Sequence, residues 1–368
     1  MLKKIGSWQD RSFRKFPQYD DKFSVNVAAP IETTVASRNL RGWVTVISDL
    51  VKARLTLMVV LTTWMGFSLA STQATDGAIC LHAIIGTSLL AAGASALNQW
   101  WERDFDARMH RTASRPLPAG ILTPLTVLAF GVIVSILGLM WLAFLVNLLT
   151  AFLGAVTLAI YVFVYTPLKR TTELNTWVGA IPGALPPLMG WTAATGELGA
   201  GGWSLFAILF FWQLPHFMAI AWLYREEYAQ AGFRMLSGRD PDGRRSASSA
   251  IRNSIALIFV SAVPFLQGVS GRIYLSVALV LGGLFLIQAI RFALLLNAMS
   301  ARRLFFASIF YLPVLLAVLV MDRTKEVSSK SSLLRGKSTI TIPHSRISVP
   351  RPGAFVFNRL PRLPGDGA

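Results

Sequence analysis

Residues 79–106, ICLHAIIGTSLLAAGASALNQWWERDFD, contain an apolar run that passes directly into a group of acidic residues. No Asp, Glu, Lys or Arg occurs between residues 79 and 101. A transmembrane helix needs about 20 predominantly apolar residues to cross the hydrocarbon layer. This stretch therefore predicts a membrane-spanning helix that ends in polar residues at the membrane surface.

The rest of the chain repeats this pattern, which predicts an all-α integral membrane protein. Of its 368 residues, 54% are hydrophobic and 14% are charged, whereas soluble domains carry about 25% charged residues. Cys80 is the only cysteine, which excludes a disulfide scaffold. We expect about nine transmembrane helices, at residues 55–72, 79–101, 123–144, 147–166, 176–194, 203–223, 251–269, 274–290 and 304–321.

The basic residues orient these spans. The formal net charge is +17, but the positive residues interrupt apolar runs, so we expect a membrane as partner and no nucleic acid. With the N-terminus in the cytoplasm, 25 Lys and Arg lie on the cytoplasmic side and Arg272 alone lies in the opposite connections. The N-terminal segment contains acidic residues, unlike an organellar transit peptide. We therefore expect a multi-pass protein of the cell (inner) membrane.

Three regions follow from this arrangement. Residues 1–48 are expected to form a basic cytoplasmic extension, and residues 49–322 the membrane domain. Residues 323–368, which are basic and rich in Ser and Pro, are expected to be a disordered tail.

The acidic residues at the end of the second span suggest a metal site. Asn98, Glu102 and Asp106 are spaced by four, so they lie near one face of a helix. Two carboxylates and an amide oxygen suit Mg²⁺, which keeps waters and shares phosphate ligands. The alternative is a solvated helix end whose acids pair with Arg103 and Arg108.

Arginines that follow the acids favour the metal interpretation. Arg111 and Arg115 come just beyond Asp106, and Pro116 ends the helix there. Guanidinium groups match phosphate oxygens in bidentate geometry. Carboxylates that can bind a divalent cation are thus followed by arginines that can bind phosphate oxygens. This combination suggests a site for a metal diphosphate. The alternative is a basic anchor at the cytoplasmic surface, which any Lys or Arg would provide.

At this point the chain resembles the UbiA superfamily of intramembrane prenyltransferases, and within it the protoheme IX farnesyltransferases (heme O synthases). The resemblance covers about residues 50–322, and both terminal extensions lie outside it. The matching motifs are Lys52-x-Arg54, Asn98-x3-Glu102-x3-Asp106, Met109-x-Arg111-Thr112-x2-Arg115-Pro116-Leu117-Pro118, Tyr165-Thr166-x2-Lys169-Arg170, Gly183-Ala184-x-Pro186-Pro187-x2-Gly190-Trp191, Trp212-Gln213-x-Pro215-His216-Phe217 and Ala301-x2-Leu304-Phe305-x2-Ser308-x2-Tyr311-Leu312-Pro313.

The resemblance implies an enzyme that transfers a farnesyl group from farnesyl diphosphate to a vinyl group of protoheme IX, with heme as substrate rather than cofactor. It implies a bundle of the UbiA kind with its active site on the cytoplasmic side. Asn98, Glu102, Asp106 and Glu227 would hold Mg²⁺, and the last three would be catalytic. The candidates for binding the diphosphate are Lys52, Arg111, Arg115, Lys169 and Arg170.

Two further residues have both a functional and a structural interpretation. Tyr165 would stabilise the allylic cation through its ring, or else it belongs to the aromatic belt at the membrane surface. His216 would contact heme, or else it is a buried histidine satisfied by a neighbouring helix.

The second acidic motif departs from the family pattern. Glu227 stands where the family has Asp, and Arg234 stands where it has Pro. These departures put the second metal contact in doubt.

Two alternatives stay open. The chain could prenylate a phenolic acid or quinone precursor, or it could be a non-catalytic heme carrier. For protein partners, the resemblance leaves heme A synthase and oxidase assembly proteins open.

Overall fold

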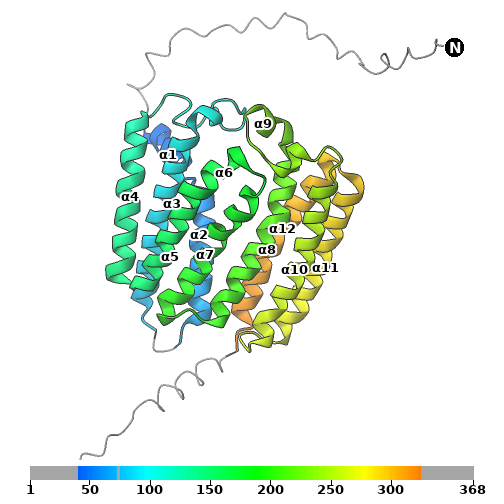
Figure 1. The fold of residues 1–368 in the computed structure, drawn as a ribbon. Helices are drawn as coiled ribbons and strands as arrows, with labels where there is room; N and C mark the ends of the chain where they lie inside the picture. Colours follow the sequence, from blue (N-terminus) through cyan, green and yellow to red (C-terminus); the bar gives the residue numbers. More distant parts are fainter. Residues whose placement is uncertain (1–39, 73–74, 325–368) are drawn as a thin grey trace, which may run out of the picture.

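The computed structural model describes residues 40–72 and 75–324, and these residues form helices joined by connections, of which the one over residues 107–123 is long (Figure 1). The long helices, roughly parallel in Figure 1, are α2 (Ala53–Ala70), α3 (Gly77–Asp106), α4 (Pro124–Leu145), α5 (Leu148–Ala159), α7 (Asn175–Thr195), α8 (Ala200–Leu223), α10 (Arg244–Leu266), α11 (Arg272–Leu295) and α12 (Ala298–Met321). Within the described ranges the only β pairing is an isolated bridge between Ser270 and Arg323. The predicted all-α class is confirmed.

Eight helices of the described part are long and apolar enough to cross a membrane. They match eight of the nine predicted spans, and the fourth of them runs continuously from Leu148 to Thr171. The remaining predicted span, 176–194, corresponds to α7, which has 21 residues and three internal prolines. Most of α7 is buried, because it packs against α2, α5 and α8. It therefore faces protein more than lipid and needs less apolar surface than its neighbours.

The helices α2 and α7 approach each other at two glycines. A Cβ on Gly190 would lie 1.9 Å from the Thr63 carbonyl oxygen, and a Cβ on Gly66 would lie 1.9 Å from the Pro187 carbonyl oxygen. Only residues without a side chain allow this contact. Small residues at such crossings are typical of membrane helices, whose association depends on close packing.

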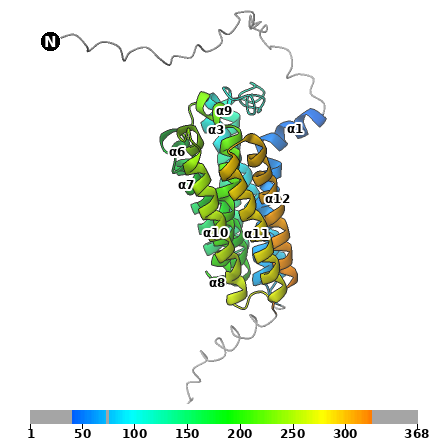
Figure 2. The same cartoon turned by 90° about the vertical axis from the view of Figure 1, so that its right-hand side faces the viewer.

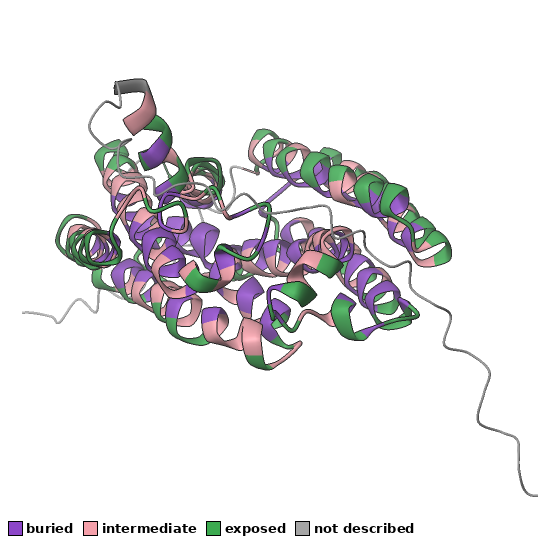
Figure 3. Cartoon of the chain, turned by 90° about the horizontal axis from the view of Figure 1, so that it is seen from above, coloured by how far each residue is buried: buried purple, intermediate pink, exposed green. Residues whose placement is uncertain are grey.

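Burial divides the bundle into an interior and an apolar outer surface. Viewed along the bundle, buried residues gather between the helices and exposed ones on their outer faces (Figure 3). Many of the exposed side chains are large and apolar, among them Phe144, Leu148, Phe259 and Leu294. Apolar patches of this extent are unusual on soluble monomers, and they suit contact with lipid.

Short elements gather at one end of the bundle, which we call the pocket end. There α3 ends, α6 (Thr166–Thr171) completes the fourth span, and α9 (Arg225–Gln230) follows α8 (Figure 1). Between α5 and α6 the fourth span passes through a π-helical segment, η1 (Ile160–Tyr165). Such segments occur often at functional sites, and this one carries Tyr161 and Tyr165.

A helix that the sequence did not predict also lies at the pocket end. α1 (Leu40–Leu50) extends sideways from the bundle (Figure 2) and crosses the predicted domain boundary at residue 48. The rest of the predicted N-terminal extension and nearly all of the predicted C-terminal tail lie outside the described residues. The three-region division therefore stays a prediction.

Candidate active site

The acidic face of α3, defined by Asn98, Glu102 and Asp106, lines a cavity at the pocket end. The side chains follow one another at intervals of four residues, and each is 3% exposed or less. The cavity has a volume of about 80 Å³. Eight of the predicted site residues meet around it: Lys52, Asn98, Glu102, Asp106, Arg111, Arg115, Tyr165 and Lys169.

Each member of the acidic face holds a cation from another segment. Lys169 Nζ lies 2.8 Å from Glu102 Oε1, and Arg115 Nη1 lies 2.6 Å from Asp106 Oδ2. Lys52 Nζ donates to Asn98 Oδ1 over 2.7 Å. The cavity therefore alternates anionic and cationic groups. The alternative, in which these acids pair with Arg103 and Arg108, is not found. Arg103 contacts Asp104, and Arg108 lies over the Phe105 ring.

The side chain of Asn98 is oriented by two contacts. Its amide nitrogen donates to Thr166 Oγ1 over 3.1 Å, and the Thr166 hydroxyl donates to the Tyr161 carbonyl oxygen. The amide oxygen therefore turns toward Lys52 and the cavity. Because the oxygen is the group that could bind a metal, this orientation suits the predicted role of Asn98.

Lys52 is held in the cavity by an unusual turn. It lies between α1 and α2 with a φ of 48°, in the left-handed region. The Gln99 amide donates to the carbonyl oxygens of Asp49 and Leu50 and so fixes this turn on α3. Burial, together with the positive charges of Arg115 and Lys169, lowers the pKa of Lys52 to about 7. A bound anion would favour the charged form of Lys52 and so raise its pKa again.

Two tyrosines of η1 contact the lysines of the cavity, and of the two Tyr165 lines it. Lys169 Nζ lies 4.6 Å from the centre of the Tyr165 ring, so this ring already contacts a cation. The Tyr161 hydroxyl lies 3.5 Å from Lys52 Nζ. Tyr161 was not predicted as a site residue, although its spacing of four from Tyr165 on an expected helix was a usable signal.

Arg111 reaches the cavity beside two tyrosines of the α8–α9 region. Its Nη2 donates to the Tyr228 hydroxyl over 3.3 Å, and its guanidinium lies 5.6 Å from the Tyr224 ring centre. Tyr228 also lines the cavity. The sequence gives no signal for Tyr228, because only the folded chain brings α9 next to the loop after α3.

Three predicted site residues do not line this cavity. Arg170 donates to the Trp101 carbonyl oxygen over 2.9 Å and lies 3.8 Å from the centre of the Phe105 ring. His216 contacts Ser308 on α12, with its Nδ1 2.7 Å from the serine oxygen. Glu227 lines a neighbouring cavity of about 350 Å³, between the end of α8 and the α11–α12 turn.

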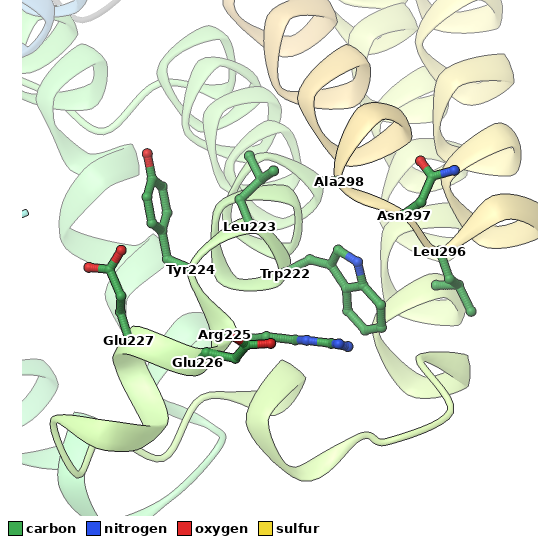
Figure 4. Close-up of a pocket in the computed structure, with 9 residues that line it drawn as sticks. All are labelled: Trp222, Leu223, Tyr224, Arg225, Glu226, Glu227, Leu296, Asn297 and Ala298. Atoms are coloured by element: carbon green, nitrogen blue, oxygen red, sulfur yellow. The ribbon is translucent and has the colours of Figure 1, made fainter. Parts of the chain in front are cut away.

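Figure 4 shows the surroundings of Glu227. Its carboxylate lies on the same side as the Tyr224 ring, whereas Trp222 and Arg225 point toward Leu296 and Asn297. One carboxylate oxygen of Glu227, Oε2, is buried without a hydrogen-bond partner among the described residues. The structure therefore does not join Glu227 to the acidic face of α3, and its role as a metal ligand stays a prediction.

The donor set fits a divalent cation that is shared with an anionic ligand. Within residues 40–72 and 75–324, no three His, Cys, Asp or Glu side chains form a complete metal site. Glu102, Asp106 and the Asn98 amide oxygen do face one cavity, and hard oxygen donors of this kind suit Mg²⁺ that keeps its remaining ligands from water or phosphate. The cations beside them suit the phosphate oxygens.

Comparison with known proteins gives consistent matches over the membrane domain. The UbiA prenyltransferase family matches residues 59–312. A protoheme IX farnesyltransferase of Solibacter usitatus (strain Ellin6076) is 49% identical over 284 residues, which cover 75% of this chain and 97% of the relative. The mitochondrial protoheme IX farnesyltransferase of Homo sapiens is 39% identical and is matched over 75% of this chain and 61% of its own length.

Solved structures support the same fold. A structure of digeranylgeranylglyceryl phosphate synthase aligns with a TM-score of 0.66 at 16% identity, over 76% of this chain and 98% of that one. A UbiA homologue from Archaeoglobus fulgidus, bound to GPP and Mg²⁺, aligns with a TM-score of 0.54 at 16% identity, over 74% of this chain and 99% of that one. At such identities the likeness concerns the arrangement of the helices alone.

Proposed function

This chain belongs to the UbiA prenyltransferase family, and from that membership we propose that it transfers a farnesyl group from farnesyl diphosphate to a vinyl group of protoheme IX (heme B), giving heme O and diphosphate. The heme acceptor is supported by the relatives, which are named protoheme IX farnesyltransferase at 43–49% identity. The observation that carries the proposal is the acidic face of α3, with a cation from a different segment on each member.

The reaction balances with one water molecule. The allylic C–O bond of farnesyl diphosphate breaks, and its electron pair leaves with diphosphate. The terminal vinyl carbon of heme forms a C–C bond with the farnesyl C1. Hydroxide from water adds to the other vinyl carbon, and a proton is released. No oxidant or reductant is needed.

The residues of the cavity can bind both partners of a metal diphosphate. In the free protein Lys169 and Arg115 pair with the carboxylates of Glu102 and Asp106, and Lys52 contacts the neutral amide of Asn98, so one positive charge has no carboxylate partner on the acidic face. When the diphosphate enters, Lys52, Arg115 and Lys169 can turn to its oxygens. Glu102 and Asp106 would then hold Mg²⁺ in place of these side chains. Arg111, held between Tyr224 and Tyr228, can contact the same group. Mg²⁺, when bound, would neutralise negative charge on the departing diphosphate.

The protein must also protect the allylic cation from bulk water. Tyr165 lines the cavity beside Lys169 and can present its ring to the cation once Lys169 turns to the phosphate. The farnesyl chain and the apolar faces of heme are compatible with a site that opens into the bilayer. A membrane protein suits this chemistry because both substrates partition into lipid.

We place the enzyme in the cell (inner) membrane with the pocket end in the cytoplasm. Basic residues support this orientation, because Lys52, Arg111, Arg115 and Lys169 lie at the pocket end, whereas Arg272 begins α11 at the other end. Farnesyl diphosphate is charged, and it would reach the acidic face of α3 from the cytoplasmic side.

A product-mass assay tests this function. The full chain in nanodiscs is incubated with farnesyl diphosphate, Mg²⁺ and either protoheme IX or 4-hydroxybenzoate. We expect the mass of heme O in the first reaction and no prenylated phenol in the second. Chelation of divalent cations should reduce the yield by roughly 100-fold or more, as expected when a charge-stabilising group is lost.

Two results would contradict the proposal. A prenyl mass on the phenol alone would assign the chain to another branch of the family. Heme binding without any prenyl transfer, and indifferent to Mg²⁺, would favour a heme carrier.

A further inference from the structure

The membrane-embedded His216 is built into an aromatic wall that the diphosphate chemistry does not use. Its imidazole stacks on Trp212, with ring centres 5.2 Å apart and an interplanar angle of 20°. It also stacks on Phe305 of α12, at 5.0 Å and 25°. Aromatic rings of α8 and α12 therefore stack on the imidazole, and its polar contacts are made at its edge, where the two nitrogens lie.

One edge nitrogen is fixed by Ser308. Nδ1 of His216 lies 2.7 Å from Ser308 Oγ, and Ser308 Oγ donates to the Phe305 carbonyl oxygen over 2.5 Å. A serine hydroxyl has a single proton. The two contacts of the hydroxyl are satisfied together only when it donates to the carbonyl oxygen and accepts from His216, which requires the imidazole proton on Nδ1.

In this tautomer the other ring nitrogen, Nε2, carries no proton. In a neutral imidazole with a proton on Nδ1, Nε2 has a free lone pair. No hydrogen bond from Nε2 to another described residue is found. A histidine whose Nδ1 donates to an oxygen and whose Nε2 is free is the form that binds metals in proteins.

Ser308 is itself held by α8. Trp212 Nε1 donates to the Ser308 carbonyl oxygen over 2.8 Å. Trp212 and His216 are four residues apart, so they project from one face of α8 and contact the same residue of α12. These two hydrogen bonds fix the distance between the helices as well as the direction of the imidazole.

We propose that His216 binds the iron of the acceptor heme through Nε2, and that Ser308 is a positioning residue that selects the required tautomer. This inference rests on the proposed function, because it takes an iron porphyrin as the acceptor. His216 lies about two turns before Leu223, the last residue of α8. The heme iron would then be deeper in the membrane than the diphosphate, and the aromatic wall would contact the macrocycle.

Spectroscopy of the full chain in nanodiscs tests the ligand without requiring turnover. Ferric protoheme is titrated and followed by absorption and electron paramagnetic resonance, with metal-free protoporphyrin IX as a matched probe. We expect His216→Ala to weaken protoheme affinity at least tenfold and to remove the histidine-ligated spectrum. Added imidazole should restore that spectrum. Affinity for protoporphyrin IX should change less than about twofold, since it has no iron to bind.

Ser308 variants separate positioning from simple packing. Ser308→Ala should weaken protoheme affinity by about 10-fold, as is typical for a residue that orients a metal ligand, and Ser308→Thr, which keeps the hydroxyl, should restore it. The control is His82→Ala, because His82 lies in α3 and contacts Trp141 in a tilted arrangement, with ring centres 5.8 Å apart. That variant should bind protoheme like the unmodified chain.

The outcomes distinguish this inference from the function on which it rests. An unchanged spectrum in His216→Ala, or an equal loss of protoheme and protoporphyrin IX, would overturn iron binding by His216. Heme O formation by the unmodified chain together with either result would leave the function standing. A histidine-ligated spectrum that depends on His216, without heme O formation, would support the ligand and contradict the function.

Discussion

Glu102 and Lys169 form a buried ion pair whose partners come from α3 and α6. Their side chains are 4% and 13% exposed, and the two atoms are 2.8 Å apart. Replacing Glu102 by Gln would leave the Lys169 ammonium without its anion and would replace a carboxylate of the proposed metal site by a neutral amide. We expect roughly 100-fold or greater loss of heme O formation, with a decrease in thermal stability because a buried charge loses its partner.

A matched control for Glu102→Gln is available at the same end of the bundle. Glu173 pairs with Arg245 over 2.5 Å, but the Arg245 side chain is 59% exposed. Exposed pairs contribute about 0–1 kcal/mol, so Glu173→Gln should keep its activity within about twofold of the unmodified chain. Equal turnover in the two variants, measured as product mass over time, would contradict the assignment of Glu102.

Helix geometry explains which of the site residues could be predicted from the sequence. The spacing of four placed Asn98, Glu102 and Asp106 on one face, because helix geometry alone decides it. Lys169 and Arg170 are consecutive in α6, so they point about 100° apart, and only Lys169 lines the cavity. The same reasoning applies in α9, where Tyr228 lines the cavity.

Other site residues could not be predicted, because only tertiary contacts bring them to the cavity. Gln99 acts on a turn roughly fifty positions earlier, and Tyr228 meets Arg111 from a distant part of the chain. Neither pairing leaves a periodic pattern in the sequence. The contact between His216 and Ser308 likewise joins two helices that are far apart in the sequence.

At the scale of elements, the contact between α2 and α7 depends on glycines that let the two backbones approach each other. We predict that Gly190→Ala destabilises the protein by about 1–3 kcal/mol, because its Cβ would overlap the Thr63 carbonyl oxygen and push the helices apart. Thermal unfolding in detergent, followed by light scattering, measures the effect. The control is Gly283→Ala in α11, where a Cβ meets nothing within 4 Å. That change should be neutral or slightly stabilising.

The apolar runs predicted the elements well, and the misses have physical reasons. A long apolar run predicts a transmembrane helix, because inside the lipid every backbone N–H and C=O group must form its hydrogen bond within the helix. α1 was missed because its 11 residues are too few to span a membrane. The π-helical segment η1 was missed because it lies inside a continuous apolar run, and hydropathy does not distinguish π- from α-helical backbone.

For the whole molecule, the described chain begins and ends at opposite ends of the bundle (Figure 1). α1 lies at the pocket end, whereas α12 ends beside the turn before α11, where Gly271 N donates to the Asp322 carbonyl oxygen. The bundle therefore has a definite direction in the membrane. The basic residues at the pocket end support the proposed orientation, in which this end lies in the cytoplasm.

Cysteine labelling tests this orientation directly, because Cys80 is the only native cysteine. In a Cys80→Ser background, Asp242→Cys adds an exposed thiol at the pocket end and Glu197→Cys adds one at the other end. A membrane-impermeant maleimide should label Asp242→Cys only in inverted vesicles and Glu197→Cys only in right-side-out vesicles. The reverse pattern would place the acidic face of α3 outside the cell, where neither the positive-inside rule nor a cytoplasmic supply of farnesyl diphosphate could explain the site.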